Sequence, residues 1–349
     1  MKKIITFYHQ DLAQKHLFQY ISKHFNKKKF KIKFTKNFNY KSDIGFYAEN
    51  SNNIKKINSK ISFITLGGID QGKLFWPNFW KKESWNKFDF GFLPSIHWAK
   101  MWKCSSWLDK SRPKIAMLLT GWPKSEEITK VKLRKKNKIE TILYAPCFET
   151  DNKGMDVVNA LENQKINLLV KHLPWNEKKQ IKKFKDVRDN IKKMISYSKK
   201  KLKSRVKIIN NKDNIMKYYN KADLLITDES SVMYEALLYN LPSLSCDDWP
   251  MRINNSNKPR KIKKDSRVCL YVKKRNLKKK INILRYQNKK LQKNCIVKKN
   301  YFFSYINSSA KNIVDFIETY LESGKVKFEI KPKFKVNIFK SKIMSFLIK

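Results

Sequence analysis

The stretch ADLLITDESSVMYEALLYNLP at residues 222–242 constrains the fold of this chain more than any other segment. Its apolar run, 224–226, is too short for a helix and is typical of a strand that is buried on both faces. Ser230 or Ser231 predicts the N-cap of a following helix, and Asn240 and Pro242 predict its end. A buried strand that turns directly into a helix indicates an α/β protein.

The turn between this strand and helix is a candidate nucleotide site. Thr227 and Asp228 end the strand, and the hydroxyl groups of Ser230 and Ser231 are expected beside the free backbone N–H groups of the helix start. Such a spot suits a phosphate group. Glu235, one turn further on, is placed to accept hydrogen bonds from a ribose. The alternative is an ordinary capped helix that binds no ligand.

Short apolar runs alternate with helical patterns along the chain, which predicts mostly parallel sheets covered by helices. We predict two doubly wound, Rossmann-like domains, 1–132 and 139–307, that face a central cleft in a GT-B-like arrangement, followed by a helix and basic tail at 308–349. The lysine-rich run 133–138 is the expected linker. The expected strands are 4–8, 44–48, 61–66, 88–93, 115–119, 139–145, 168–170, 206–209 and 224–226.

The end of the chain is expected to be less regular. Residues 251–265 are polar and predict a mobile loop, 274–293 predict one basic helix, and 308–322 predict an amphipathic helix. The tail 325–349 interleaves lysines with apolar side chains, a pattern typical of segments that lie on an anionic membrane surface. The alternative is that the tail packs back on the N-terminal domain.

The net charge of +49, from 78 basic and 29 acidic residues, predicts attraction to polyanions. The chain has no helix-turn-helix, zinc-finger or RNA-recognition signature, so an anionic polymer or the inner leaflet of the membrane is favoured over nucleic acid. It has no apolar run of about 18 residues, and its first ten residues read as a strand rather than a signal peptide. Five scattered cysteines favour the cytoplasm.

A glycine cluster follows the expected strand 61–66. Only eight glycines occur in the chain, and Gly67, Gly68 and Gly72 lie together in TLGGIDQGK with Asp70 and Lys73. The clustering predicts a backbone with positive φ or one that approaches a ligand, here an acceptor or phosphate loop. The spacing is not that of a Walker loop. A simple tight turn is the alternative.

His172 is the best-placed histidine, because it follows the expected strand 168–170 at the edge where α/β sheets bind ligands. There an imidazole can donate to a pyrophosphate. His97 is a second cleft candidate, and His9 follows the first strand. No cluster has the spacing of a metal site. Seven of the nine tryptophans lie within 76–122, either as core or as a platform for a sugar or lipid.

Several segments together resemble the CDP-glycerol glycerophosphotransferase family of teichoic acid and capsule biosynthesis. The strand–turn–helix at 222–242 is similar to the family's strand–TDYSS–helix segment, with Glu229 where tyrosine is common. LLVKHLP at 168–174 resembles a strand that ends in a His-Pro pair, here interrupted by Leu173. The other similar segments are LLTGWPKSEEI (118–128), ILYAPCFE (142–149) and YINSSAKNIVDFI (305–317).

The resemblance implies a metal-independent GT-B transferase whose second domain binds the cytidine diphosphate of CDP-glycerol and whose first presents the acceptor. His172, Ser230 and Ser231 would bind the pyrophosphate, and Glu235 the ribose. The family's proposed general base is the histidine of a His-Gly pair, and the matching place here is Gly67–Gly68. Asp70, His97 or another group would then take the proton.

Two other functions remain open at this point. One is a GT-B glycosyltransferase that uses a CMP- or UDP-sugar, which shares the same type of nucleotide site and is favoured by Glu235. The other is a non-catalytic polyanion-binding protein on a transferase scaffold, which the charge and the missing histidine favour. We expect a peripheral membrane enzyme that extends a surface polymer or a lipid-linked acceptor.

Overall fold

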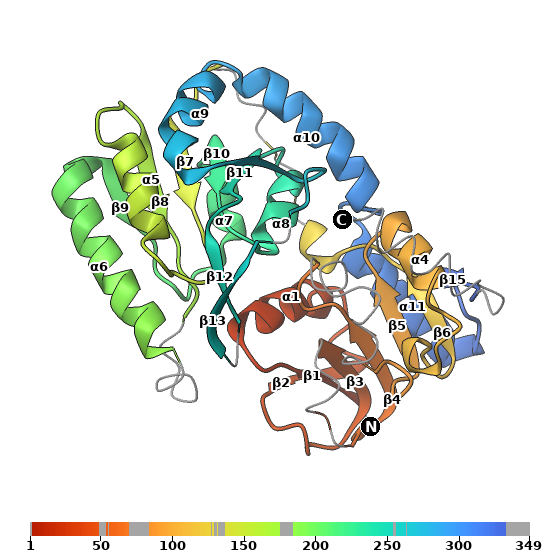
Figure 1. Ribbon diagram of the computed structural model, residues 1–349. Coiled ribbons are helices and arrows are strands. Elements are labelled where there is room, and N and C mark those ends of the chain that lie inside the picture. Colours follow the sequence, from red (N-terminus) through yellow and green to blue (C-terminus); the bar gives the residue numbers. More distant parts are fainter. Residues whose placement is uncertain are drawn as a thin grey trace. The chain divides into compact units, whose positions relative to one another are not determined.

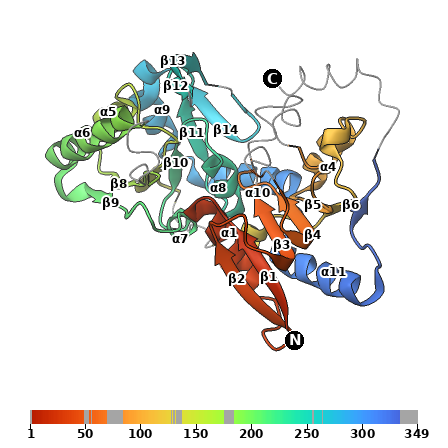
Figure 2. The ribbon, with the colours of Figure 1, turned by 90° about the horizontal axis from the view of Figure 1, so that it is seen from below.

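The computed structural model describes residues 2–48, 54, 56–69, 84–126, 128, 131, 137–174, 184–253, 256–262 and 264–332. The chain forms two compact units (Figure 1 and Figure 2). The first comprises 1–130 together with 300–349, and the second comprises 131–299. The C-terminal part of the chain therefore belongs to the same unit as its N-terminal part.

The first unit is built on a seven-stranded sheet. Its strands are β1 (Lys3–Tyr8), β2 (Phe30–Thr35), β3 (Ser42–Ala48), β4 (Ser59–Thr65), β5 (Phe90–Leu93), β6 (Ala116–Leu119) and β15 (Glu329–Ile330). They lie in the order β15-β6-β5-β4-β3-β1-β2, and all neighbours are parallel except β15 with β6. The chain winds outward in both directions from β1, as in a doubly wound sheet. In the part of this unit that the structure describes, the helices are α1 (Leu12–Ser22), α4 (Ile96–Lys103) and α11 (Ser309–Ser323).

A ladder of phenylalanine rings holds this sheet in register. Phe7 pairs with Phe46, Phe46 with Phe63, and Phe63 with Phe90 on successive parallel strands. Neighbouring ring centroids are 4.6, 5.2 and 5.3 Å apart. Phe316 of α11 meets Phe90 edge-on at 5.2 Å. Because aromatic pairs add to the free energy of burial, α11 is part of this core.

The second unit carries a six-stranded sheet in which every neighbouring pair is parallel. Its strands are β7 (Thr141–Tyr144), β8 (Asn167–Val170), β9 (Val206–Ile208), β10 (Leu224–Ile226), β11 (Ser243–Cys246) and β14 (Cys269–Val272). Their order, β14-β11-β10-β7-β8-β9, is that of the Rossmann fold. The order reverses between β7 and β10, and such a switch point is where these sheets bind ligands.

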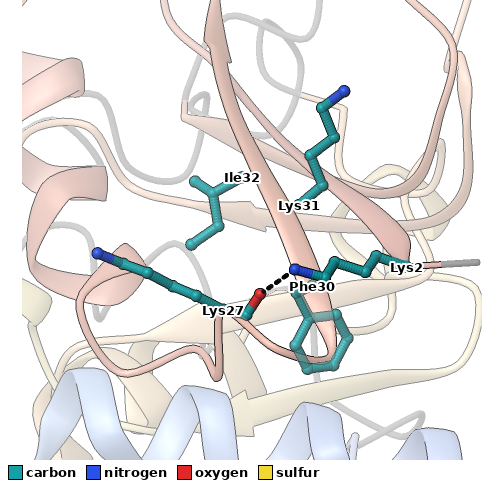
Figure 3. Close-up of a pocket in the computed structure, with 5 residues that line it drawn as sticks. All are labelled: Lys2, Lys27, Phe30, Lys31 and Ile32. Carbon is teal, nitrogen blue, oxygen red and sulfur yellow. Dashed lines mark hydrogen bonds between the residues drawn. The ribbon is translucent and has the colours of Figure 1, made fainter.

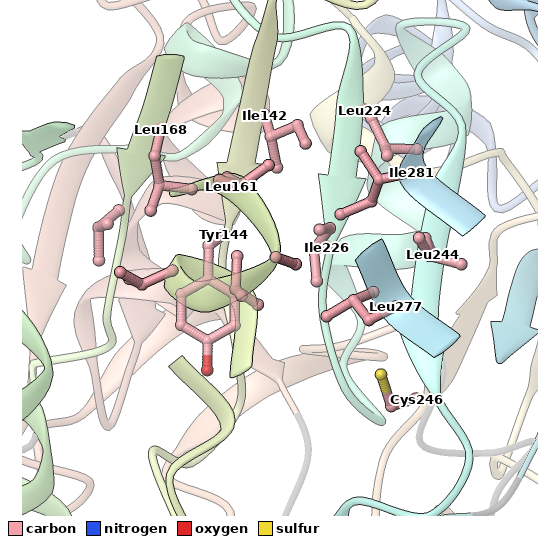
Figure 4. Packing of buried hydrophobic residues seen from close by; sticks show 14 of the residues in the cluster. Ile142, Tyr144, Leu161, Leu168, Leu224, Ile226, Leu244, Cys246, Leu277 and Ile281 are labelled. Atoms are coloured by element: carbon pink, nitrogen blue, oxygen red, sulfur yellow. The ribbon is translucent and has the colours of Figure 1, made fainter. Parts of the chain in front are cut away.

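Alternate side chains of these strands form the core of the second unit (Figure 4). Ile142 and Tyr144 point into it from β7, whereas Leu143 between them is buried outside this cluster. Residues of α5 (Lys153–Leu161), α6 (Lys185–Leu202) and α9 (Leu277–Leu284) complete it, so these helices cover one face of the sheet. The other helices of the unit are α7 (Met216–Tyr219), α8 (Val232–Leu238) and α10 (Asn288–Phe302), whose residues 300–302 belong to the first unit.

Two expectations for the basic C-terminal half were wrong. The segment expected as a mobile loop contains the antiparallel strands β12 (Pro250–Ile253) and β13 (Ser256–Lys261), in which Met251 lies opposite Arg260. Backbone pairing rather than an apolar pattern forms this hairpin, so periodicity did not indicate it. The helix expected over 274–293 is instead α9 and α10, separated by residues 285–287. Strands β2 and β14 were not predicted either.

The first residues of the tail, 325–332, belong to the described part of the chain. Strand β15 pairs antiparallel with β6, and the Phe328 ring lies 5.9 Å from that of Tyr305. This part packs within the first unit, as one of the two alternatives expected. Residues 333–349, on which the membrane interpretation mainly depends, lie outside the described residues. Among the helices that are described, none is long and apolar enough to cross a bilayer.

Candidate functional site

Polar side chains gather where β7, β8 and β10 end, at the carboxyl edge of the second sheet. Asp228 follows β10, Lys171 and His172 follow β8, and Glu149 lies in the loop after β7. All four are buried. This edge contains the switch point between β7 and β10, so the fold places charged groups where a ligand is expected.

Asp228 joins the loops that follow β7 and β10. Its Oδ2 atom lies 3.0 Å from the Nζ atom of Lys153, and its Oδ1 atom accepts a hydrogen bond of 2.7 Å from the backbone N–H of Cys147. Both side chains of the ion pair are 0% exposed. Removing two charges from water is expensive unless each keeps a partner. The pair therefore fixes the position of both loops.

Glu149 collects three hydrogen bonds in the interior of the same edge. Its Oε2 atom accepts from the Tyr144 hydroxyl at 3.0 Å and lies 2.9 Å from Nε2 of His172, and its Oε1 atom accepts from Gly154 N–H at 2.8 Å. A carboxylate can only accept, so Nε2 of His172 carries a proton. The imidazole is thereby held in one orientation, with Nδ1 on its other side.

The loop before α5 explains how Glu149 and Lys153 reach this cluster together. Asp151 and Asn152 have φ of 49° and 61°, a left-handed conformation that Asp and Asn tolerate better than other non-glycine residues. Gly154 then starts the helix close to α6, because an added Cβ would lie 2.3 Å from Cγ of Met194. The left-handed residues and the close packing at Gly154 depend on local geometry, so hydrophobic periodicity in the sequence does not predict them.

The loop that contains Glu229 is tied to the β12–β13 hairpin. Arg260 on β13 donates to both carboxylate oxygens of Glu229, at 2.6 and 2.8 Å. Such a bidentate pair is stronger than a single contact and holds the guanidinium plane. The pairing with Glu229 raises the pKa of Arg260, and the nearby Cys147 and Asp228 raise it further. Sequence reasoning missed this cation, because it lies in the segment expected to be a mobile loop.

Lys171 places a second cation at the edge, and backbone carbonyl groups of two loops hold its ammonium group. Its Nζ atom donates to the carbonyls of His172 at 3.0 Å and Asn211 at 2.9 Å. Burial lowers the pKa of Lys171 to about 8, against the partly compensating charge of Asp213. The ammonium is thus still charged at neutral pH but loses its proton more easily than an exposed lysine.

This shift predicts a pH dependence of folding. Between about pH 8 and the ordinary lysine value of 10.5, the unfolded chain keeps a proton that the folded chain has released. The free energy of unfolding should therefore rise with pH in this window, by up to about 1.4 kcal/mol per pH unit. Urea unfolding of the wild type and of Lys171→Gln, near pH 7 and near pH 10, measures the effect. An equal change in the free energy of unfolding between the two pH values in both proteins would contradict the predicted role of Lys171.

The predicted donor residues have unequal surroundings. Thr227 is buried and its hydroxyl donates to the carbonyl of Ala145 at 2.7 Å, which makes it part of the framework. Ser231 occupies the N-cap position of α8, but its hydroxyl makes no capping hydrogen bond there. Ser230 is 9% exposed. The serine hydroxyls are therefore the less constrained polar groups of this turn.

Glu235 does not lie where the ribose interpretation requires an accessible carboxylate. Its residue is only 2% exposed, and Oε2 accepts a hydrogen bond of 3.1 Å from the hydroxyl of Tyr219. That contact raises the pKa of the tyrosine, whose burial is the larger cause. Glu235 thus joins α7 to α8 in this structure. Its proposed contact with a ribose would require it to change partners.

The candidates of the first unit are described only in part. His97 lies in α4, which begins with Ser95 as its side-chain N-cap, and its Nδ1 atom is 2.9 Å from the hydroxyl of Tyr301. Asp70 and Lys73 lie outside the described residues. The described glycines with positive φ are Gly121 and Gly324, so that reason for Gly67 and Gly68 was wrong.

Other sequence features of the first unit are part of its core. His9 is buried, and burial together with Lys15 and Lys36 lowers its pKa. Most of the described members of the tryptophan cluster are also buried, which favours core over a platform. Within the described chain, no three His, Cys, Asp or Glu side chains lie close enough to hold a metal ion. The buried tryptophans are Trp85, Trp98, Trp102 and Trp122.

Comparison with known proteins adds a family and a fold. A family model described as CDP-glycerol:poly(glycerophosphate) glycerophosphotransferase matches residues 80–318, which is more than half of the chain. A search of curated protein sequences finds no significant match.

Three solved structures share the fold. They are the wall teichoic acid polymerase TagF (15% identity, TM-score 0.56, 92% of this chain and 90% of that chain), a TagF variant soaked with CDPG (14%, 0.58, 92% and 89%), and the S. aureus MnaA–UDP co-structure (12%, 0.55, 95% and 100%). These likenesses confirm the predicted α/β, GT-B-like class.

Proposed function

The chain belongs to the CDP-glycerol:poly(glycerophosphate) glycerophosphotransferase family, and we propose that it extends a teichoic-acid-like surface polymer at the membrane. The resemblance seen in the sequence is confirmed, and the chain is a glycerophosphotransferase. CDP-glycerol is the donor that fits this family, and we propose it as the donor of this chain. The observation that carries this conclusion is the family match over 80–318, which includes the whole polar edge of the second sheet.

We place the donor at that edge. His172 is oriented by Glu149, and Ser230 and Ser231 lie at the turn after β10. Lys171 and Arg260 add positive charge at the same edge. Hydrogen-bond donors and fixed cations of this kind stabilise the two negative charges of a pyrophosphate.

The proposed reaction is a single displacement at phosphorus. An acceptor hydroxyl attacks the phosphoryl group that carries glycerol, the new P–O bond forms, and the bond to the bridging oxygen breaks. CMP leaves with the electron pair of that bond, and the hydroxyl proton passes to a general base. The donor-site cations stabilise the charge that develops on CMP. Asp70 and His97 remain the proposed bases, with Gly67, Gly68 and Lys73 beside the acceptor.

A nucleotide screen tests the donor. We expect CDP-glycerol to raise the thermal midpoint of the protein and UDP-sugars to leave it unchanged, because a ligand that binds only the folded state stabilises it by about 2.7 kcal/mol at 100 times its Kd. The shift should persist in high salt, which screens non-specific attraction of any nucleotide to a basic protein. A shift with UDP-sugars alone would favour the rival glycosyltransferase, for which the fold shared with the MnaA–UDP co-structure is the supporting observation. No salt-resistant shift would favour a non-catalytic polyanion-binding protein.

The double variant Ser230→Ala/Ser231→Ala tests the turn after β10. We expect it to raise the Kd for CDP-glycerol by about 100-fold or more, since it removes two hydrogen bonds to a charged group, each of which contributes about 1.5 kcal/mol or more. Titration calorimetry measures this directly. The matched control is Ser204→Ala, which removes an exposed hydroxyl elsewhere in the second unit. Equal affinities in both variants would remove the serines from the donor site.

Two further properties are proposed with this function. Transfer should need no metal ion, because the described donor edge supplies its own cations; turnover that stops with EDTA and returns with a divalent metal would show otherwise. The +49 charge favours peripheral binding to the anionic cytoplasmic leaflet. In that case high salt should release the protein from membranes, whereas retention through a salt wash would contradict electrostatic attachment.

A further inference from the structure

Two adjoining hollows lie at the amino-terminal ends of β1 and β2, and both are lined by Lys2 and Phe30. Figure 3 shows the first of them. Their volumes are about 380 and 530 Å³. We call them together the lysine hollow. Its remaining lining residues are Lys3, Lys27, Lys28, Lys29, Lys31, Ile32, Glu318, Leu321 and Glu322.

The fold concentrates charge at this place. Parallel pairing of Lys3 with Phe30 brings the starts of β1 and β2 side by side, and the turn before β2 supplies further lysines. The acids of the hollow come from α11, and one of them, Glu322, lies 3.5 Å from Lys29. The pKa of Asp43 is lowered mainly by Lys60 and in smaller part by Lys3, so Lys3 also has a carboxylate nearby. The remaining lysines form no ion pair with a carboxylate of the described chain, so most of the positive charge of the hollow is uncompensated. They are Lys2, Lys27, Lys28 and Lys31.

The hollow combines this charge with an apolar floor. The Lys2 ammonium donates to the carbonyl of Lys27 at 2.9 Å, while the side chains of Lys27 and Lys31 extend in different directions (Figure 3). The Phe30 ring lies below the Lys2 side chain in Figure 3, and Phe30 is 6% exposed. Several separate ammonium groups around an apolar surface suit a chain of phosphates joined by short carbon units better than a single compact anion.

We propose that the lysine hollow binds the phosphodiester backbone of the acceptor polymer at a distance from its reacting end. This inference rests on the proposed function, because it takes the polymer to be poly(glycerophosphate). The hollow lies at the amino edge of the first sheet, whereas ligands of such sheets react at the carboxyl edge. The six residues of β1 separate the two edges by about 20 Å.

That distance makes the inference specific. A long acceptor reaches from the carboxyl edge to the lysine hollow, whereas an acceptor of a single unit does not. The hollow should therefore raise the affinity for long polymers and keep the enzyme on one chain through successive additions. It should have no effect on the transfer to a short acceptor.

The test compares two triple variants with the same change in charge. Lys2→Gln/Lys27→Gln/Lys31→Gln alters the hollow, and Lys192→Gln/Lys193→Gln/Lys200→Gln alters exposed lysines of α6 in the second unit. Fluorescence anisotropy with labelled poly(glycerophosphate) gives the Kd over a range of salt concentrations. We expect the hollow variant to bind about tenfold more weakly and to show a smaller salt slope, by about 0.7 for each phosphate that it no longer neutralises.

Each outcome decides the matter. Equal weakening in the two variants would overturn the inference in favour of general charge attraction, as would unchanged binding in the hollow variant. A selective loss of binding to vesicles of anionic lipid, with polymer binding intact, would assign the hollow to the membrane instead. In transfer assays the hollow variant should keep its turnover with a single-unit acceptor and raise KM only for long polymer. If the wild type showed no transfer at all but the hollow variant still lost polymer binding selectively, the proposed function would be overturned and the binding site would remain.

Discussion

The variant Asp228→Ala should lower the free energy of unfolding by about 3–5 kcal/mol, because it leaves the ammonium group of Lys153 buried without a counter-charge. Both side chains of this ion pair are 0% exposed, and Asp228 also accepts the backbone N–H of Cys147. A loss of this size is a large part of the 5–15 kcal/mol that holds a typical domain folded. Chemical denaturation followed by circular dichroism measures it.

The double variant Asp228→Leu/Lys153→Met is the control for this prediction. Replacing both members of a buried ion pair with apolar residues of similar size is often neutral or stabilising. We therefore expect the double variant to recover much of the stability that Asp228→Ala loses. If the single variant were as stable as the wild type, the ion pair would not hold these loops, and the role given to Asp228 at the carboxyl edge would be wrong.

The elements that the sequence predicted best are those whose burial shows in consecutive residues. The run Leu224–Ile226 is apolar at every position, and it forms the central strand β10 as expected. Strand β2, Phe30–Thr35, alternates phenylalanine and isoleucine with lysine at the edge of its sheet, and its apolar positions were too few to stand out. Strand β13 contains Pro259, pairs with β12, and is also attached to Glu229 through Arg260. Its sequence carries no apolar signal.

The candidate site was predicted in position but not in its connections. The ends of β8 and β10 were located correctly, so His172 and Asp228 were assigned to one edge. The partners Glu149 and Lys153 were missed, because each contact joins residues far apart in sequence and depends on strand order. A carboxylate four residues after the predicted strand 139–145, in ILYAPCFE, was the available signal for Glu149.

Part of the small set of acidic residues is buried in the second unit. Several of the 29 acidic residues lie inside the second unit, where they hold loops through hydrogen bonds or ion pairs. Each acid used in this way is withdrawn from the surface, which is left to lysine. Two of these acids are each paired with a cation, Asp228 with Lys153 and Glu229 with Arg260, so burial of these pairs leaves the net charge of +49 unchanged. Among the described residues of this unit, the buried acids are Glu149, Asp228, Glu229, Glu235 and Asp265.

The second large effect is expected at His172. The variant His172→Ala should lower kcat/KM for CDP-glycerol by about 10²–10³, the usual cost of removing one charge-stabilising donor from an active site. Glu149→Gln should lower it by about tenfold, because a neutral amide cannot accept from Tyr144, His172 and Gly154 together. Steady-state release of CMP at varied donor concentration measures both effects.

The variant Tyr144→Phe separates the effect of Glu149 on the orientation of His172 from its effect on the stability of the fold. It removes one of the three hydrogen bonds to Glu149 and leaves the contact between Glu149 and His172 in place. We expect this variant to lose stability while retaining most of its kcat/KM, whereas Glu149→Gln loses kcat/KM as well. The imidazole nitrogen shifts of His172 in NMR spectra should change only in Glu149→Gln, since its tautomer depends on the carboxylate. If Glu149→Gln kept both the wild-type spectrum and wild-type kcat/KM, Glu149 would be a structural residue only, and the orientation of His172 would have another cause.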